Sequence, residues 1–280
     1  MKLLQSLETE IETAFPMQYL DFNGYRFSYR EQGTGPAIIF LHGIGSGSGS
    51  WNNQLKGLAA KFRIIAWDAP GYGGTTRLPV ENPDAKHYRE ALEEFILALD
   101  IKPHLLVGHS FGALIGGNYA KSHAELPALV LANPANGYGA ADKEIRAEKL
   151  SMRLVSMEKL GPKGLAAARS SGLLSDNASE GAKALVHWNM RKLNPVGYAQ
   201  AAHMLTNAHL VGDAPSYLGP VLVMCGNKDT ITPEAQCRLV ADAYSNSRYK
   251  TLLDVGHASY IEDGIQFNKE ILTFIREVYG

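Results

Sequence analysis

The stretch Gly108-His109-Ser110-Phe111-Gly112 has the pattern G-x-S-x-G and decides how the rest of this 280-residue sequence is interpreted. It follows the apolar run 104–107 and precedes a helical pattern at 111–120 that is rich in Gly and Ala. A serine between a strand and a helix sits on a sharp turn, and a glycine on either side makes room for it. The motif therefore predicts that Ser110 is a nucleophile at the end of a strand.

Further short runs of strand character lie on both sides of this motif, each bounded by turn residues. They occupy residues 37–41, 63–67, 129–132, 221–224 and 248–253. Continuous apolar runs of this length suit strands that are buried on both faces, as in a parallel sheet. Asn23-Gly24 between two β-rich runs predicts a hairpin before the first of them.

Helical patterns alternate with these strands. They lie at 88–99, after Thr232-Pro233 and at 266–278, and we expect Thr232 to cap its helix with Pro233 in the first helical position. The alternation predicts an α/β fold with a mostly parallel sheet and a hairpin at its start.

The strand pattern stops between residues 137 and 213, where helical stripes dominate. No Pro-, Gly- or Ser-rich linker separates this segment from the rest of the chain. We therefore expect one catalytic α/β core, formed by residues 1–136 and 214–280, and an inserted helical cap, or lid, at 137–213.

A nucleophilic serine needs a base, and the base needs an acid that orients it. His257 lies just past the last predicted strand, and Asp229 follows the strand before it. The carboxyl ends of parallel strands share one edge of the sheet, where sites form. We therefore expect Ser110, Asp229 and His257 to meet at that edge.

Other titratable residues fit the two partner positions less well. Asp254 and Asp263 are near His257 in the sequence but not at a comparable strand end. His109 lies within the G-x-S-x-G turn and receives no catalytic role. His42 is interpreted as a structural hydrogen-bonding residue.

A Gly- and Ser-rich stretch follows the first apolar run. The dinucleotide fingerprint G-x-G-x-x-G requires glycine where Ser48 or Ser50 stands, and no Lys-Ser/Thr pair follows as in a phosphate-binding loop. The glycines instead allow a backbone N–H to turn toward a ligand oxygen. The N–H groups of Ile44 and Phe111 would together hold a developing oxyanion.

Composition limits the partners of the chain. Lys and Arg number 27 against 28 Asp and Glu, a formal net charge of −1. This balance gives no electrostatic reason to expect nucleic acid or an anionic membrane. Two cysteines exclude a disulfide scaffold and a four-cysteine zinc site. We expect a small-molecule substrate, no metal and no cofactor, and the sequence leaves a homodimer open.

The N-terminal residues favour a short amphipathic helix. Gln5 and Ser6 break the apolar run that a signal peptide would need, and Glu8 follows. No stretch is as long as a membrane span. We therefore expect a cytoplasmic protein with Cys225 and Cys237 as free thiols.

Five motifs in this order resemble the α/β-hydrolase superfamily over nearly the whole chain. They are Leu41-His42-Gly43, Asp68-Ala69-Pro70-Gly71-Tyr72-Gly73, Gly108 to Gly112, Gly226-Asn227-Lys228-Asp229 and Gly256-His257. The chain order of Ser110, Asp229 and His257 is also the order of that family's catalytic triad. The resemblance implies the α/β-hydrolase fold, with an inserted cap.

Two subfamilies resemble the chain more closely. Residues 194–199, Asn-Pro-Val-Gly-Tyr-Ala, look like the cap of 3-oxoadipate enol-lactonase-like hydrolases. The N-terminal hairpin and glycine loop also resemble the C–C bond hydrolases that act on ring-cleavage products in aromatic catabolism. Those enzymes often have Asn and Met on either side of the serine, where this chain has His109 and Phe111.

The resulting expectation is a serine hydrolase that cleaves an ester or lactone through an acyl-enzyme. Arg191 would bind a substrate carboxylate or face solvent. Trp188 would contact substrate or pack the cap, and Gly43 and Tyr198 are further candidates for substrate binding. The alternatives are a C–C bond hydrolase, a non-catalytic binding protein, and a cofactor-free oxygenase or lyase.

Overall fold

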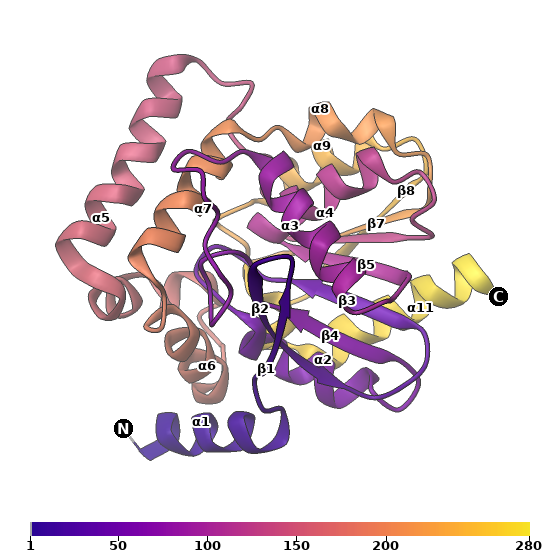
Figure 1. The fold of residues 1–280 in the computed structure, drawn as a ribbon, viewed down its shortest axis with the longest axis horizontal. Coiled ribbons are helices and arrows are strands. Elements are labelled where there is room, and N and C mark those ends of the chain that lie inside the picture. The colour runs from indigo at the N-terminus through magenta and orange to yellow at the C-terminus, as the bar shows by residue number, and fades with distance from the viewer. Residues whose placement is uncertain (1) are drawn as a thin grey trace.

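The computed structural model describes residues 2–280 and contains an eight-stranded sheet with helices on both faces (Figure 1). The strands are β1 (Gln18–Phe22), β2 (Tyr25–Gln32), β3 (Ala37–Leu41), β4 (Arg63–Trp67), β5 (Pro103–His109), β6 (Leu129–Ala132), β7 (Val221–Gly226) and β8 (Ser247–Leu252). Their order in the sheet is β1-β2-β4-β3-β5-β6-β7-β8. The β1–β2 and β2–β4 pairs are antiparallel and the other neighbouring pairs are parallel, which confirms the predicted sheet and hairpin.

The helices that alternate with the strands divide between the two faces. They are α1 (Lys2–Ala14), α2 (Asn52–Leu58), α3 (Ala85–Ala98), α4 (Phe111–Ser122), α9 (Glu234–Ala243), α10 (Ser259–Glu262) and α11 (Gly264–Tyr279). Side chains of α3, α4 and α9 join one apolar cluster, and those of α1, α2 and α11 join a second. No helix in the described part of the chain is both long enough and apolar enough to cross a membrane.

Strand β3 shows why both faces are covered. Ile39 and Leu41 belong to the first cluster, and Ile38 and Phe40 belong to the second. Successive side chains of a strand point to opposite faces, so a continuous apolar strand requires a helix layer on each side. The uninterrupted apolar run in the sequence therefore corresponds to a central strand of the sheet.

The segment between β6 and β7 is helical. Its helices are α5 (Lys143–Arg169), α6 (Glu180–Met190), α7 (Pro195–Asn207) and α8 (Leu210–Asp213). Helix α7 packs tightly on the loop after β4, because a Cβ added to Gly197 would lie 2.1 Å from the carbonyl oxygen of Gly71. Gln200 Nε2 also donates to the carbonyl groups of Leu78 and Val80, at 2.8 and 2.6 Å.

Two local expectations differ from the structure. Helix α9 begins at Glu234, so Pro233 is its cap residue, and Thr232 instead forms hydrogen bonds with Asp229. In the predicted amphipathic helix α1, Ile11 is fully buried and Leu4 and Leu7 pack against the second cluster, whereas 52% of Leu3 is exposed, so Leu3 lies off the packed face.

Candidate active site

Ser110 occupies a strained turn between β5 and α4. Its φ of 51° and ψ of −109° are values that side-chain-bearing residues rarely adopt, and such a conformation costs about 1–3 kcal/mol. The two flanking positions have no room for a side chain. A Cβ on Gly112 would lie 2.2 Å from the carbonyl oxygen of Leu41, and a Cβ on Gly108 would lie 2.5 Å from the carbonyl oxygen of Gly112. The turn that the G-x-S-x-G motif predicts is therefore present, and it brings Ser110 to the carboxyl edge of the sheet.

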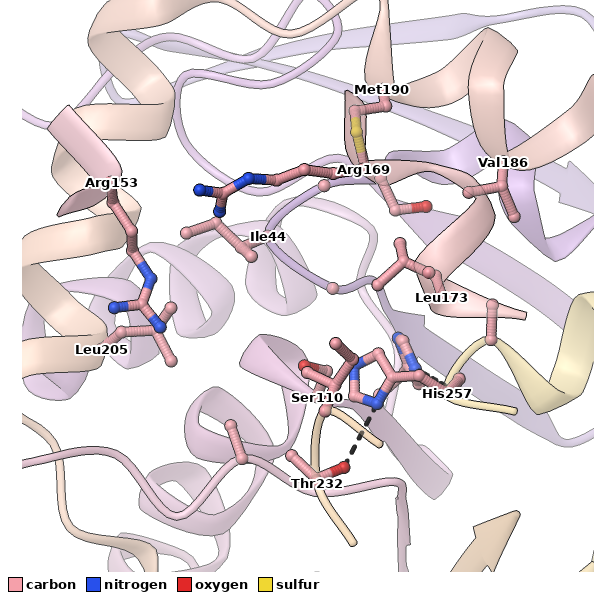
Figure 2. Close-up of a pocket in the computed structure, with 18 of the residues that line it drawn as sticks. Ile44, Ser110, Arg153, Arg169, Leu173, Val186, Met190, Leu205, Thr232 and His257 are labelled. Carbon is pink, nitrogen blue, oxygen red and sulfur yellow. Dashed lines mark hydrogen bonds between the residues drawn. The ribbon is translucent and has the colours of Figure 1, made fainter. Parts of the chain in front are cut away.

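His257 and Asp229 form a hydrogen-bonded pair beside this serine. His257 Nδ1 is 2.9 Å from Asp229 Oδ2, and both residues are buried. Asp229 Oδ1 also accepts from the N–H groups of Ile231 and Thr232, at 2.8 and 2.9 Å. Figure 2 shows Ser110 next to the imidazole of His257.

The surroundings of Asp229 keep its carboxylate ionised. Burial by itself would raise the pKa, but the hydrogen bond and the positive charge of His257 and the bonds from Thr232 and Asn133 hold the pKa of Asp229 well below its usual range. An ionised carboxylate only accepts hydrogen bonds. His257 Nδ1 therefore donates to Asp229, which leaves Nε2 as the ring nitrogen that can exchange a proton with a substrate or with Ser110.

Asn133 and Thr232 support the acid. Asn133 Nδ2 and Thr232 Oγ1 each lie 2.8 Å from Asp229 Oδ2. Asn133 follows β6, is fully buried, and accepts from Ser259 Oγ at 2.7 Å. Neither residue was a sequence candidate for the site, because a lone Asn or Thr after a strand carries no motif.

The glycine loop lies over Ser110. A Cβ on Gly43 would be 3.5 Å from the Cβ of Ser110, so the loop backbone passes directly above the serine. The N–H of Ile44 has no hydrogen-bond partner within residues 2–280. The N–H of Phe111 is in the first turn of α4, where N–H groups lack partners inside the helix. Two backbone donors are thus available near the serine.

His42 holds this loop through hydrogen bonds of both of its ring nitrogens. Its Nε2 accepts from the N–H of Ala69 at 3.1 Å, so Nδ1 carries the hydrogen and donates to the carbonyl of Gly43 at 2.8 Å. Burial lowers the pKa of His42 and favours the neutral ring. The hydroxyl of Tyr72 adds a bond to the carbonyl of Ile44, at 2.9 Å.

A cavity of about 790 Å³ lies between the serine and helices α5 to α7. Its walls include several apolar side chains, namely Ile44, Leu165, Leu173, Val186, Met190 and Leu205. Among the residues singled out from the sequence, Gly43, Ile44, Ser110, Tyr198 and His257 line the cavity. The volume is in the range of small-molecule sites.

Four sequence candidates lie outside the cavity lining. Asp229 is behind His257, and the Phe111 ring is fully buried against Tyr88. Trp188 packs against Gly49, and the ammonium of Lys192 is 4.0 Å from the centre of its ring. Arg191 is the C-terminal cap residue of α6 and is not part of the wall.

The lining residues that the sequence analysis did not assign to the site include His109, Arg153 and Arg169. The His109 ring is buried, its Nε2 is 2.9 Å from the carbonyl oxygen of His257, and its Nδ1 has no partner in the described residues. Burial, with a smaller contribution from His257, lowers the pKa of His109 to about 3. Its ring is therefore neutral near pH 7.

The described residues contain no group of three or more His, Cys, Asp or Glu side chains arranged to hold a metal ion. Cys225 and Cys237 are free and buried, as free thiols were expected.

Comparisons with known proteins agree with this fold. A family model described as alpha/beta hydrolase fold matches residues 36–264. An esterase from Thermogutta terrifontis has a TM-score of 0.83 at 20% identity, over 94% of this chain and 99% of that chain. The enol-lactonase from Burkholderia xenovorans LB400 has a TM-score of 0.82 at 26% identity, over 92% of this chain and 100% of that chain.

A curated relative covers part of the chain at higher identity. The 2-hydroxy-6-oxo-6-(2'-aminophenyl)hexa-2,4-dienoic acid hydrolase of Metapseudomonas resinovorans is 32% identical over 136 residues, which are 47% of this chain and 47% of that protein. Both subfamilies that the sequence resembles are thus represented among its relatives. Because the family model spans most of the chain and the fold agrees with it, the chain belongs to the α/β-hydrolase fold family of hydrolases.

Proposed function

We propose that this protein is a serine hydrolase that cleaves an ester or lactone of a small substrate. The observation that carries the proposal is the hydrogen-bonded pair of Asp229 and His257 beside Ser110. Ser110 itself lies on a strained turn, below a loop in which the N–H of Ile44 has no partner within residues 2–280. The lining of the adjacent cavity suits a small, partly apolar substrate. We assign Ser110 as nucleophile, His257 as general base and Asp229 as the acid that orients it.

Acylation begins when Ser110 Oγ attacks the carbonyl carbon and its proton passes to Nε2 of His257. Asp229 holds Nδ1–H and stabilises the imidazolium that forms. The N–H groups of Ile44 and Phe111 bind the oxyanion. The bond to the leaving alkoxide oxygen then breaks, and that oxygen takes the proton from Nε2.

Deacylation repeats these steps with water. Water gives a proton to Nε2 of His257 as it attacks the acyl carbon, and Ser110 Oγ leaves and regains the proton. The products are an acid and an alcohol, which are a single hydroxy acid when the substrate is a lactone. In this proposal residues 137–213 act as the lid over a core formed by 1–136 and 214–280.

The first experiment measures p-nitrophenyl acetate turnover and labelling by a fluorophosphonate. The wild type should be active and labelled once, and Ser110→Ala should be unlabelled and about a thousand-fold or more slower. Ser122→Ala, at the exposed end of α4, is the matched control and should behave as the wild type. Full activity of Ser110→Ala would sink the assignment.

A second candidate function is C–C bond hydrolysis of ring-cleavage products. The 32% identity to the dienoic acid hydrolase over 136 residues favours it. A panel of short esters, lactones and dienoic ring-cleavage products separates the two. Turnover of the dienoates alone would replace the ester or lactone assignment, and tight binding without turnover would indicate a binding protein.

A further inference from the structure

Helix α5 brings two arginines to the same side of the cavity. Arg153 and Arg169 are 16 residues apart in the sequence, which would separate them by about 24 Å along a straight helix. The helix is broken at Gly161, which has a φ of 61° and a ψ of 177°, and Pro162 follows. That backbone conformation is essentially restricted to glycine. The break divides α5 into two helices that meet at a kink (Figure 1).

A contact across the break brings the Arg169 guanidinium to the half of the helix that carries Arg153. Arg169 Nη2 donates to Ser156 Oγ at 3.0 Å, and Ser156 lies one turn from Arg153 on the same helix. Arg153 donates to the carbonyl of Lys149 at 2.8 Å and to the hydroxyl of Tyr138 at 3.4 Å, and its guanidinium lies 5.3 Å from the centre of the Tyr138 ring. Figure 2 shows both guanidinium groups on one side of the cavity, with Ser110 and His257 on the other.

Neither arginine has an acidic partner. No carboxylate within residues 2–280 comes within 4.0 Å of Arg153 or Arg169. A guanidinium has five N–H donors, and the bonds above use only a minority of them. Donors that face a cavity and lack protein partners are available to a ligand.

The cavity wall as a whole favours a negative ligand. Its lining residues include two arginines and no Asp or Glu. Both arginines also act on Tyr198, a buried lining residue: burial raises the pKa of Tyr198, and the charges of Arg153 and Arg169 oppose that rise. Their positive fields therefore overlap inside the cavity.

We propose that Arg153 and Arg169 form a carboxylate-binding subsite, and that the substrate is an ester or lactone with a carboxylate at the end remote from its scissile carbonyl. This inference rests on the proposed function. The planar fork of a guanidinium matches a carboxylate in a bidentate manner. In the view of Figure 2, Ile44 lies between Arg169 and Ser110, and Leu165 and Leu205 also line the cavity, so an apolar chain suits the stretch between the two ends of the substrate.

The test uses two esters with the same leaving group and the same number of acyl carbons. They are p-nitrophenyl hydrogen glutarate, whose acyl chain ends in a carboxylate, and p-nitrophenyl pentanoate, which ends in a methyl group. The wild type should prefer the glutarate ester in kcat/KM by about tenfold or more, as expected for charge-assisted hydrogen bonds. Arg153→Gln and Arg169→Gln should each lower that preference about tenfold, because kcat/KM falls much more for the glutarate ester than for the pentanoate ester.

Arg191→Gln is the matched comparison, because Arg191 does not line the cavity. We expect the same glutarate preference as in the wild type. A loss of preference in Arg191→Gln alone would overturn the proposal and return the carboxylate site to the residue chosen from the sequence. Arg153→Lys keeps the charge without the fork, and should retain part of the preference.

Binding measurements separate this proposal from the proposed function. Glutarate should inhibit pentanoate hydrolysis competitively, and in calorimetry it should bind about tenfold more weakly to Arg153→Gln than to the wild type. If neither ester is hydrolysed but glutarate still binds through these arginines, the nucleophile assignment fails and the subsite stands. Equal use of both esters by the wild type, or inhibition by inorganic phosphate and not by glutarate, would overturn the carboxylate subsite.

Discussion

Replacing Asn133 with Gly tests whether the acid of the site is held as the structure indicates. Asn133 donates to Asp229 Oδ2 at 2.8 Å and accepts from Ser259 Oγ at 2.7 Å, and all three side chains are buried. A hydrogen bond to a charged group contributes about 1.5–3 kcal/mol, and a buried hydroxyl left without a partner costs about 1–3 kcal/mol. The free energy of unfolding should fall by about 3–5 kcal/mol at pH 7.

Glycine is the informative replacement at this position. Asn133 has a φ of 46°, which glycine adopts freely, whereas Ala would add about 1–2 kcal/mol of backbone strain. Asp229 keeps its bonds from Ile231 and Thr232, so it remains near His257, and kcat/KM should fall by up to about 100-fold through misplacement. The expected activity loss is smaller than the loss from removing the acid.

The assay is urea unfolding followed by tryptophan fluorescence, with the denaturant slope compared between variants. Asn227→Gly is the control, because Asn227 is exposed and, within residues 2–280, its side chain accepts only from the N–H of Asp254. It should cost less than about 1 kcal/mol. A loss below about 1 kcal/mol in Asn133→Gly itself would refute the reasoning that this residue holds Asp229.

Three further predictions follow from the same geometry. Asp229→Asn should lower kcat about ten-thousand-fold with the fold retained, because an amide stabilises the wrong tautomer of His257; a kcat within tenfold of the wild type would contradict this. Gly161→Ala should destabilise the protein by about 1–3 kcal/mol and, by displacing Arg169, lower the preference for the glutarate ester; unchanged stability and preference would be the contrary result. The pKa of His109 is about 3 in the folded protein and about 6.5 in the unfolded chain. Between these two pH values the unfolded state binds more protons, so the free energy of unfolding decreases by about 1.4 kcal/mol for each unit by which the pH is lowered. Urea unfolding at pH 6 and pH 4.5 should therefore show a shallower decline for His109→Gln, and an identical decline would contradict the burial effect.

The central strands of the sheet were predictable because they are buried on both faces. A strand such as β3 is apolar at every position, so its residues can be recognised without knowing their neighbours. The G-x-S-x-G turn was predictable for a similar reason, since Gly108 and Gly112 are imposed by close backbone approach at that turn. Requirements of this kind involve neighbouring residues, so they can be recognised from the sequence alone.

The side of the cavity that carries Arg153 and Arg169 was not predictable in the same way. Arg153, Arg169 and Arg191 all lack an acid three or four residues away, so helical spacing does not separate them. The break at Gly161 brings the first two arginines together, while Arg191 ends α6 outside the cavity. That outcome depends on how the helices of residues 137–213 fold on one another.

His109 illustrates a second limit. Its position within the turn gave no sign that its ring would line the cavity wall and bond to the carbonyl of His257. This contact joins residues 148 apart in the sequence and depends on how β5 lies relative to the chain after β8. Only the assembled sheet defines it.

The central claim is that Ser110 forms a covalent acyl-enzyme during turnover. The most direct measurement quenches the wild type in acid during p-nitrophenyl pentanoate hydrolysis and identifies the acylated peptide by mass spectrometry. The account predicts one pentanoyl group, on Ser110, and none in Ser110→Ala. Steady hydrolysis with no acylated peptide, or with the acyl group on another residue, would contradict it.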